Sequence, residues 1–241
     1  MPTIAMLTDR LFSAATGAEV AEVCLAFLHA RGVVMGSYHH LPPVGAFDAI
    51  PTIEVATSGF PLDWVAFYRR NRLYEVDPIP RHAMSAVRPF WWSETARFDD
   101  NTSDERAYLL TLRRAKLGDG LAVPVFGPKG RDGYVGLGFG QLDRLPSQMQ
   151  VARLQLCCQL GHLRYCEILL PEMPRPVLSG REREVLHWMV RGKSNAVIGT
   201  IIGLSANTID TYVRRIYAKL RVNDRITAVL RGLALGLAGN P

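Results

Sequence analysis

The residues whose chemistry is easiest to interpret lie near the C-terminus, in the stretch SANTIDTYVRRIYAKL. Small polar side chains, Ser205, Asn207 and Thr208, stand at its front, and Arg214 and Arg215 follow further along. Arginine binds guanine edges and phosphates, threonine contacts the thymine methyl group, and aspartate accepts a hydrogen bond from cytosine. Free backbone N–H groups at the front of a helix also favour a phosphate. These residue types together are typical of a surface that contacts duplex DNA.

The apolar pattern of the same stretch predicts a helix with one buried face. Ile209, Val213 and Ile216 recur three or four positions apart, as in a helix side that faces a core. The opposite side would then face DNA, and we expect base contacts from Asp210, Thr211 and Arg214. The residues expected to hold the phosphate backbone are Lys193, Ser205, Thr208, Arg215 and Lys219. The full predicted DNA-binding set is Lys193, Ser205, Asn207, Thr208, Asp210, Thr211, Arg214, Arg215 and Lys219.

The residues around this stretch predict the other elements of a helix-turn-helix. Ser179 and Glu182 have the spacing of a capping box, which marks a helix start. Gly192 suits the left-handed residue after that helix, and Gly203 permits a sharp turn between a second and a third helix. A fourth helix, DRITAVLRGLALGLA, has more apolar surface than a small module needs for its own core. We therefore expect it to contribute to a dimer.

Net charge separates this region from the rest of the chain. Residues 175–241 contain 11 Lys and Arg against 4 Asp and Glu, whereas residues 1–174 contain 17 against 18. A basic module beside a near-neutral region is what binding to a phosphate backbone requires, because cations there release condensed counterions.

A spaced proline triplet, Pro171, Pro174 and Pro176, lies where the charge balance changes. Proline removes backbone donors and disfavours helix in the residue before it, so the triplet predicts a linker. The predicted domains are residues 1–170 and 178–241, joined by a linker at 171–177.

The first 170 residues mix helix and strand patterns. Predicted helices lie at 17–31, 61–71, 102–116 and 147–169, and predicted strands at 33–41, 52–60, 121–127 and 133–140. The glycine-rich GPKGRD between the last two strands predicts a hairpin turn. Because the strands are joined by hairpin-like links rather than by alternating helices, we expect an antiparallel sheet with helices on its faces. The predicted fold class is therefore α+β, followed by an all-α four-helix domain.

The cysteines and the apolar segments bear on the cellular setting. Cys24, Cys157, Cys158 and Cys166 lack the CxxC spacing of a metal site. We interpret them as reduced thiols in a cytoplasmic protein and predict no metal and no cofactor. The N-terminus lacks the pattern of a secretory signal, and no apolar run approaches the length of a membrane span, so no membrane partner is expected.

The C-terminal stretch LSGREREVLHWMVRGKSNAVIGTIIGLSANTIDTYVRRIYAKL closely resembles the DNA-binding domain of LuxR-type regulators. The residues at the recurring positions of that family are Glu182, Leu186, Gly192, Thr208, Ile216, Lys219 and Leu220. Phosphorylated response regulators use the same module, so this resemblance by itself does not identify the N-terminal domain.

The N-terminal region resembles the autoinducer-binding domain of quorum-sensing LuxR-type proteins, in the order and spacing of Trp64, Tyr68, Asp77-Pro78, Trp92 and Gly120. The resemblance implies an α/β/α sandwich with a five-stranded antiparallel sheet and a pocket for an N-acyl homoserine lactone. It implies that the tryptophan hydrogen-bonds the lactone carbonyl and that the aspartate accepts the ligand amide N–H. Both domains together imply a homodimer on a palindromic site in double-stranded DNA, with RNA polymerase as a further candidate partner.

The residue types suit that ligand independently of the resemblance. Trp64 offers an apolar plate with one N–H donor, and the Asp77 carboxylate can accept an amide N–H in a charge-assisted bond. An acyl chain needs apolar walls. The predicted ligand-binding set is Phe60, Trp64, Tyr68, Asp77, Ile79, Phe90, Trp92, Leu112, Gly120, Ala122 and Gly136.

Two positions depart from the family pattern. Relatives often have tyrosine where this chain has Phe60, and serine or threonine where it has Gly136. Both hydroxyls are missing here, and Gly136 with Gly138 would leave extra room. We therefore expect the acyl side to be recognised less by polar contacts, which favours a ligand without a 3-oxo group or one with a bulky, branched or aryl acyl group.

Three other functions stay open at this point. A response regulator with the same DNA-binding module would need an N-terminal receiver of alternating βα units. A LuxR-type protein without a lactone partner would sense another small molecule. An enzyme would need acid-base groups such as His39, His40 and Glu54, but adjacent residues of a strand point to opposite faces, so the two histidines do not readily share a site. We predict no catalytic residues and no enzymatic activity.

Overall fold

The structure is a computed structural model that describes residues 1–49, 55–141 and 145–238. It divides into two compact units, the first made of residues 1–41 and 52–171 and the second of residues 42–51 and 172–241. Glu54 lies outside the described residues, as do residues 52–54 of the strand predicted at 52–60.

A five-stranded sheet forms the centre of the first unit, in the order β2-β1-β5-β4-β3. All four neighbouring pairs are antiparallel, which confirms the predicted sheet and differs from the alternating βα units of a receiver domain. The strands are β1 Met35–Leu41, β2 Val55–Ser58, β3 Phe90–Trp91, β4 Gly120–Val125 and β5 Asp132–Gly138.

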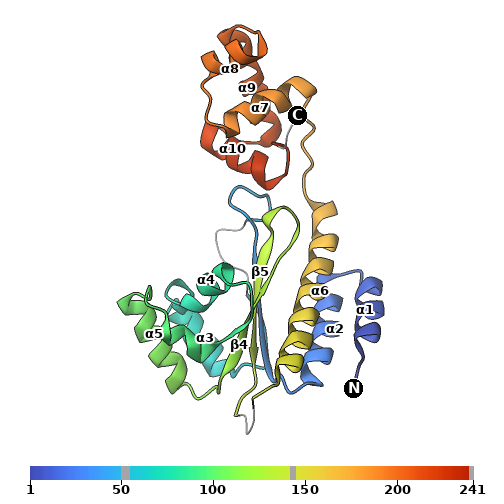
Figure 1. The fold of residues 1–241 in the computed structure, drawn as a ribbon, viewed down its shortest axis with the longest axis vertical. Coiled ribbons are helices and arrows are strands. Elements are labelled where there is room, and N and C mark those ends of the chain that lie inside the picture. The colour runs from blue at the N-terminus through green and yellow to red at the C-terminus, as the bar shows by residue number, and fades with distance from the viewer. Residues whose placement is uncertain (50–54, 142–144, 239–241) are drawn as a thin grey trace. The chain divides into compact units, whose positions relative to one another are not determined.

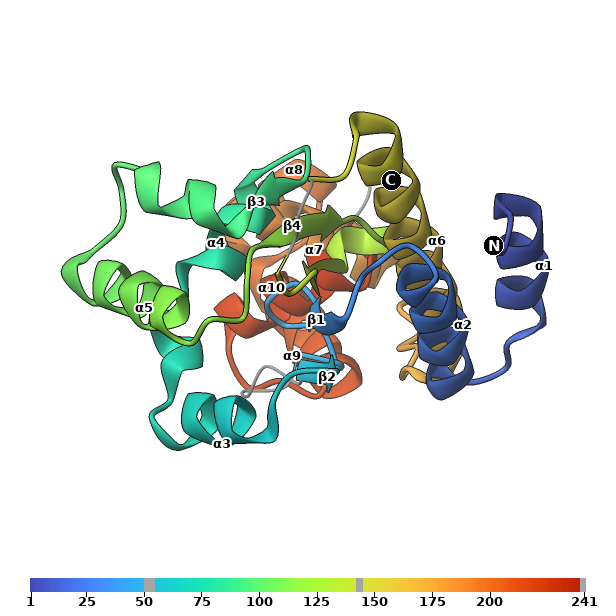
Figure 2. The ribbon, with the colours of Figure 1, turned by 90° about the horizontal axis from the view of Figure 1, so that it is seen from below.

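Helices cover both faces of this sheet, so the unit is an α/β/α sandwich as predicted (Figures 1 and 2). One face carries α1 Ile4–Ser13, α2 Gly17–His29 and α6 Gln148–Glu172, and the other carries α3 Leu62–Arg70, α4 Pro78–Ser85 and α5 Ser103–Arg114. Strand alternation divides the side chains between the two faces. Leu121, Val123 and Leu137 pack towards the first set of helices, whereas Ala122 and Tyr134 pack towards the second.

Four elements differ from the sequence prediction, and one of them is strand β3, which was not predicted. Helices α1 and α4 were not predicted, and α4 begins with Pro78, which is tolerated because the N–H at that position has no intrahelical partner. Helix α6 continues to Glu172, so Pro171, predicted as the first linker residue, lies in the last turn of the helix. The missing N–H of Pro171 removes a single bond at the helix end, which explains why the helix persists through it.

Four helices make up most of the second unit: α7 Gly180–Val190, α8 Asn195–Ile202, α9 Ala206–Leu220 and α10 Arg225–Ala234. Helices α8 and α9 meet at an angle of 110°, in the range of a helix-turn-helix. Gly203 between them has φ +72°, a left-handed conformation that glycine adopts without strain. Leu186, Ile198, Ile209 and Ile216 are fully buried where the helices meet.

Within residues 1–49, 55–141 and 145–238, no single helix is long and apolar enough to cross a bilayer. The bent pair of α8 and α9 meets the length and composition criteria only when the two helices are taken together.

A buried ion pair joins the first and third helices of the second unit. Glu182 is only 3% exposed, and its carboxylate accepts a hydrogen bond from Lys219 Nζ at 2.6 Å. The same carboxylate completes the predicted capping box with Ser179. Burial raises the pKa of Glu182, but the hydrogen bonds from Lys219 and Ser179 outweigh burial and leave the pKa below its ordinary value. Lys219, predicted as a phosphate contact, therefore has a structural partner in the fold.

We expect Lys219→Ala to destabilise the second unit by about 1–2 kcal/mol, because it leaves a buried carboxylate without its cation while Lys219 itself is partly solvated. The loss should be greatest above the ordinary pKa of Glu182 and should shrink as the pH falls and the carboxyl group is protonated. Amide hydrogen exchange in α7 and α9 of the full-length chain measures it. Lys193→Ala, which removes an exposed lysine, is the matched control. Equal protection in both variants would contradict a structural role for Lys219.

Candidate ligand site and DNA-contacting surface

Asp77 lies at the centre of the predicted ligand site and is the N-cap of α4. Its Oδ1 accepts the backbone N–H of Ile79 at 2.9 Å. Its Oδ2 accepts the hydroxyls of Tyr68, at 3.0 Å, and Tyr108, at 2.9 Å. Tyr68 belongs to α3 and Tyr108 to α5, so one carboxylate joins three helices.

The environment of Asp77 shifts its acidity. The residue as a whole is half-buried, but its carboxylate end is enclosed by protein atoms, and this burial raises the pKa to about 6 from an ordinary value of 3.8. The hydrogen bonds from Ile79, Tyr108 and Tyr68 act in the opposite direction and are outweighed. At neutral pH the carboxylate is mostly ionised and remains a strong acceptor for a further N–H donor.

Apolar and aromatic side chains surround this carboxylate and line the face of the sheet covered by α3, α4 and α5. We refer to this region as the chamber. The structure brings the predicted ligand residues together here: Ile79, Trp92 and Ala122 are buried, and Phe60, Tyr68, Phe90 and Leu112 pack against them. Gly120 and Gly136 contribute backbone on the same face of the sheet.

Trp64 lies at the edge of the chamber on α3. Its ring centroid is 6.2 Å from that of Tyr68 and 6.0 Å from that of Phe67. All nine residues of α3 are described, and none of them is buried, although the helix carries three aromatic side chains. Helix α3 therefore has apolar surface that a bound molecule in the chamber would cover.

The glycines of the chamber do not leave the extra room that the sequence suggested. A Cβ atom on Gly136 would lie 2.6 Å from Ser37 Oγ and 2.7 Å from the Tyr134 hydroxyl oxygen. A Cβ on Gly138 would lie 2.7 Å from a methionine side chain, Met35. A Cβ on Gly120 would lie 2.6 Å from the Trp92 ring. The expectation of free space beside Gly136 and Gly138 is wrong, because larger side chains of the same chain already fill it.

Sequence reasoning missed four polar residues of the chamber, namely Ser37, His39, Tyr108 and Tyr134. Tyr134 and Gly136 alternate on β5, and across the ladder Ser37 pairs with Gly136 and His39 with Tyr134, so all of them share one face. Strand alternation in MGSYHHL and DGYVGLG was the available signal for Ser37, His39 and Tyr134. It gave two faces, but only packing against α4 and α5 shows which of them lines the chamber.

A hollow of about 530 Å³ elsewhere on the first unit shares only Phe90 with the predicted ligand residues. It opens at the surface and is lined by His82, Ser85, Ala86, Phe90, Arg97, Phe98, Asp99 and Asp100. Three of its eight lining residues, Arg97, Asp99 and Asp100, are charged and exposed, so it is less suited to an acyl chain than a wall of apolar side chains.

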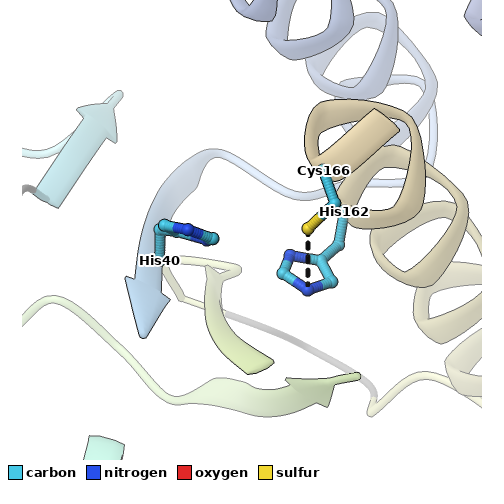
Figure 3. Close-up of side chains that lie close together, drawn as sticks. All are labelled: His40, His162 and Cys166. Carbon is cyan, nitrogen blue, oxygen red and sulfur yellow. Dashed lines mark hydrogen bonds between the residues drawn. The ribbon is translucent and has the colours of Figure 1, made fainter. Parts of the chain in front are cut away.

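On the opposite face of the sheet, His40 from β1 lies near His162 and Cys166 from α6 (Figure 3). Their potential metal-ligating atoms are all within 4.8 Å of one another. However, His162 Nε2 bonds the Arg131 carbonyl oxygen at 2.8 Å, and Nδ1 bonds the Tyr38 hydroxyl at 2.8 Å. Because a carbonyl oxygen only accepts, Nε2 carries the proton and both ring nitrogens are satisfied. These bonds account for the cluster as part of the core, and we assign no metal to it.

Helix α9 presents the predicted DNA-contacting residues on the side away from its buried residues. Asn207, Thr211 and Arg214 are exposed and lie along one stripe, since helix residues three or four positions apart share a side. Ser205 caps the helix by accepting the Thr208 N–H at 3.1 Å. The residues that line a hollow beside this stripe are Asn207, Thr208, Thr211, Tyr212 and Arg215. Tyr212 was not in the predicted set.

Asp210 has a structural role in addition to its predicted base contact. Its Oδ1 accepts the amide N–H of Asn195 at 2.5 Å, which ties α9 to the first residue of α8. Arg225 donates a second hydrogen bond to Asn195, at 3.0 Å. Asp210 is thereby held at the joint of the two helices and is less exposed than Thr211 and Arg214.

Comparison with known proteins identifies the family of each region. The family model described as the autoinducer binding domain matches residues 16–165, and the model for bacterial regulatory proteins of the luxR family matches residues 176–231. Among curated relatives, the HTH-type quorum sensing-dependent transcriptional regulator RpaR of Rhodopseudomonas palustris is 29% identical, over 78% of this chain and 76% of its own length. The transcriptional activator protein BjaR1 of Bradyrhizobium diazoefficiens is 31% identical, over 73% of this chain and 72% of its own.

Among solved structures, that of Escherichia coli SdiA covers 98% of both chains, with a TM-score of 0.73 and 20% identity. A second structure, SdiA in complex with octanoyl-rac-glycerol, aligns with a TM-score of 0.72 and 20% identity, over 98% of this chain and 96% of that one. At this level of identity these structures support the fold alone.

The fold and these family matches define a transcriptional regulator with an autoinducer-binding domain and a DNA-binding domain. The chain belongs to the LuxR family of bacterial regulatory proteins, with an autoinducer binding domain before its helix-turn-helix domain.

The raised pKa of Asp77 predicts a specific pH dependence of stability in the ligand-free protein. The folded state holds the Asp77 proton more tightly than the unfolded state does, so the contribution of this group to stability falls as the pH rises from about 4 to about 6 and is constant above that. Urea unfolding of the wild type and of Asp77→Asn over this range isolates the effect. We expect the free energy of unfolding of Asp77→Asn, relative to the wild type, to increase with pH up to about 6 and then level off. A difference that stays constant across the range would show that the carboxyl group is not shifted.

Proposed function

We propose that this LuxR-family regulator acts in quorum sensing by binding an N-acyl homoserine lactone in the chamber of the first unit. The observation that carries the proposal is the enclosed Asp77 carboxylate, which has two tyrosine hydroxyls and a backbone N–H as partners and lies among aromatic side chains. An ionised group in such surroundings is suited to a ligand that combines an N–H donor with apolar surface.

The head of a lactone ligand fits the donors and acceptors at this end of the chamber. The Trp64 indole supplies an N–H donor for the lactone carbonyl, and Asp77 supplies an acceptor for the amide N–H. Both residues flank Tyr68, whose ring is 6.2 Å from that of Trp64 and whose hydroxyl bonds Asp77. The ligand amide is thus held between α3 and the start of α4.

The acyl chain completes the packing of α3 in this proposal. That helix has no buried residue, and contact with an acyl chain would remove the apolar surface of Trp64 and Phe67 from water. A ligand that binds only the folded state stabilises it by RT ln(1 + [L]/Kd), about 2.7 kcal/mol at a ligand concentration of 100 Kd. This stabilisation couples ligand concentration to the amount of folded regulator.

A second class of ligand is favoured by one specific finding. SdiA, a structural relative, forms a complex with octanoyl-rac-glycerol, which has an acyl chain and a polar head but no lactone ring. The same chamber would accept the acyl chain of such a molecule. An ester has no N–H to donate to Asp77, however, so the enclosed carboxylate favours the amide of a lactone.

The second unit binds double-stranded DNA through α9 in this proposal. Asn207, Thr211 and Arg214 enter the major groove, and Arg215 holds the phosphate backbone. A homodimer would place two such helices on a palindromic site. Ile226 and Leu233 on α10, 73% and 51% exposed, are candidate dimer contacts, as are Leu156 and Leu163 on α6. RNA polymerase is a further candidate partner of the DNA-bound dimer.

Thermal unfolding with a panel of short, medium and long straight-chain N-acyl homoserine lactones tests the ligand. We expect at least one lactone to raise the Tm of the wild type and the effect to weaken as the pH falls through about 6, because protonation removes the acceptor of Asp77. Trp64→Phe and Asp77→Asn should each reduce the affinity about tenfold or more, since the first removes the N–H donor for the lactone carbonyl and the second replaces a charged acceptor with a weaker neutral one. Octanoyl-glycerol is the comparison ligand. Stabilisation by octanoyl-glycerol but by no lactone would reject the lactone assignment.

Binding to DNA sequences selected by the wild type from a random pool tests the reading helix. Arg214→Ala should reduce discrimination between selected and altered sequences by about 1–3 kcal/mol at one position. Arg215→Ala should weaken binding to all sequences. It should also reduce the slope of log K against log salt concentration by about one, the value for one phosphate contact. Arg183→Ala, an exposed arginine of α7, is the charge-matched control. Unchanged affinity and selectivity in both α9 variants would disprove the assignment of this helix.

A further inference from the structure

Two hydroxyls occupy the place in the chamber where a side chain at position 136 would lie. Ser37 Oγ and the Tyr134 hydroxyl oxygen are 2.6 and 2.7 Å from the position of a Cβ atom on Gly136. Ser37 is directly opposite Gly136 in the β1–β5 ladder, and Tyr134 is two residues away on β5, so all three share the chamber face. Polar groups are therefore present here, although the sequence position itself lacks one.

Two buried nitrogen atoms beside these hydroxyls have no hydrogen-bond partner among the described residues. Trp92 is 6% exposed and its Nε1 is unpaired, and His39 is 5% exposed with Nδ1 unpaired. The Tyr134 hydroxyl lies close to both the Trp92 and Ser37 side chains, and its ring is 4.8 Å from the His39 ring. Burial lowers the pKa of His39 to about 4, so its ring is neutral at physiological pH. The Trp92 N–H is close to the Tyr134 hydroxyl but has no well-aligned acceptor, and a carbonyl oxygen beside that hydroxyl would supply one.

The geometry of a secondary amide in the ligand connects the side chains of Ser37, Tyr134 and Trp92 to Asp77. A trans amide presents its N–H on one edge and its carbonyl oxygen on the opposite edge. Asp77 offers the acceptor for the first edge, and its partner Tyr108 packs in the same cluster as Tyr134. Donors for the second edge are therefore expected on the Tyr134 side.

We propose that the Tyr134 hydroxyl, together with Ser37 Oγ and the Trp92 indole N–H, binds the acyl carbonyl oxygen of the ligand. This anchor takes the place of the hydroxyls that relatives often have at the positions of Phe60 and Gly136. It rests on the proposed function, since it assumes that an acyl compound occupies the chamber. It also changes the expected selectivity, because the acyl side of the ligand is held by polar contacts of this chain rather than by apolar contacts alone.

Tyr134→Phe and Ser37→Ala in the full-length chain test this anchor, with the lactone that stabilises the wild type most strongly as the probe. Each substitution should raise the Kd for this lactone about tenfold, because the carbonyl oxygen loses a donor inside the chamber. The same two variants should also weaken binding of octanoyl-glycerol, which has an acyl carbonyl, whereas Asp77→Asn should affect chiefly the lactone. Ser37→Ala removes only one oxygen and guards against a folding defect in Tyr134→Phe.

Tyr38→Phe is the matched control, since Tyr38 is a neighbouring tyrosine on the other face of the sheet and bonds His162 instead. It should leave the Kd unchanged. Wild-type affinity in both Tyr134→Phe and Ser37→Ala, with affinity lost in Asp77→Asn, would overturn the anchor and show that the two hydroxyls only satisfy each other. Absence of lactone binding by the wild type would instead overturn the proposed function.

Discussion

The ligand-side half of the first unit depends on one buried carboxylate. Asp77 caps α4 and accepts hydrogen bonds from tyrosine hydroxyls of α3 and α5. Without Asp77, these three helices would therefore lose a side-chain group that links them. An enclosed carboxylate is stable only if hydrogen bonds compensate for its lost hydration. Three donors compensate for part of that loss, and burial outweighs them and raises the pKa to about 6. A fourth donor from a ligand would favour the ionised form, which makes this carboxylate a natural point of coupling between ligand and fold.

Glycine and large side chains are paired on the chamber face of the sheet. Tyr134 and Ser37 lie over Gly136, and Trp92 lies against Gly120. Protein interiors are close-packed, so the space left by a glycine is filled by a neighbour rather than by a void. The packing on this face of the sheet is therefore set by the large residues that fill the glycine positions. When the sequence is compared with the family position by position, a hydroxyl is missing at Gly136. In the structure, the hydroxyls of Ser37 and Tyr134 occupy the space beside that glycine.

The strand and helix patterns were sufficient to predict an antiparallel sheet with helices on its faces, and the resemblance to the family supplied the set of ligand residues that the structure gathers. It was insufficient where local patterns are short or conflict with common rules. Strand β3 has two residues, too few for any period, and α4 begins at Pro78 and contains a second proline, which conceals its helical pattern. Tyr134 and Ser37 were missed for a different reason. Alternation defines two faces of a strand, but the identity of the chamber face depends on tertiary packing.

The second unit shows the same limit for charged residues. Lys219 and Arg215 are both cations on α9, and sequence reasoning assigned both to the phosphate backbone. The structure separates them, because Lys219 is held by the buried Glu182 of α7, whereas Arg215 lies beside Tyr212 in the surface hollow. Asp210 is likewise tied to Asn195 of α8. The charges nearest the helix joints thus hold α7, α8 and α9 together, and this leaves Asn207, Thr211 and Arg214 on a rigid helix with their side chains exposed. Such a division suits sequence recognition, since a base contact is selective only when the helix that carries it is fixed in orientation.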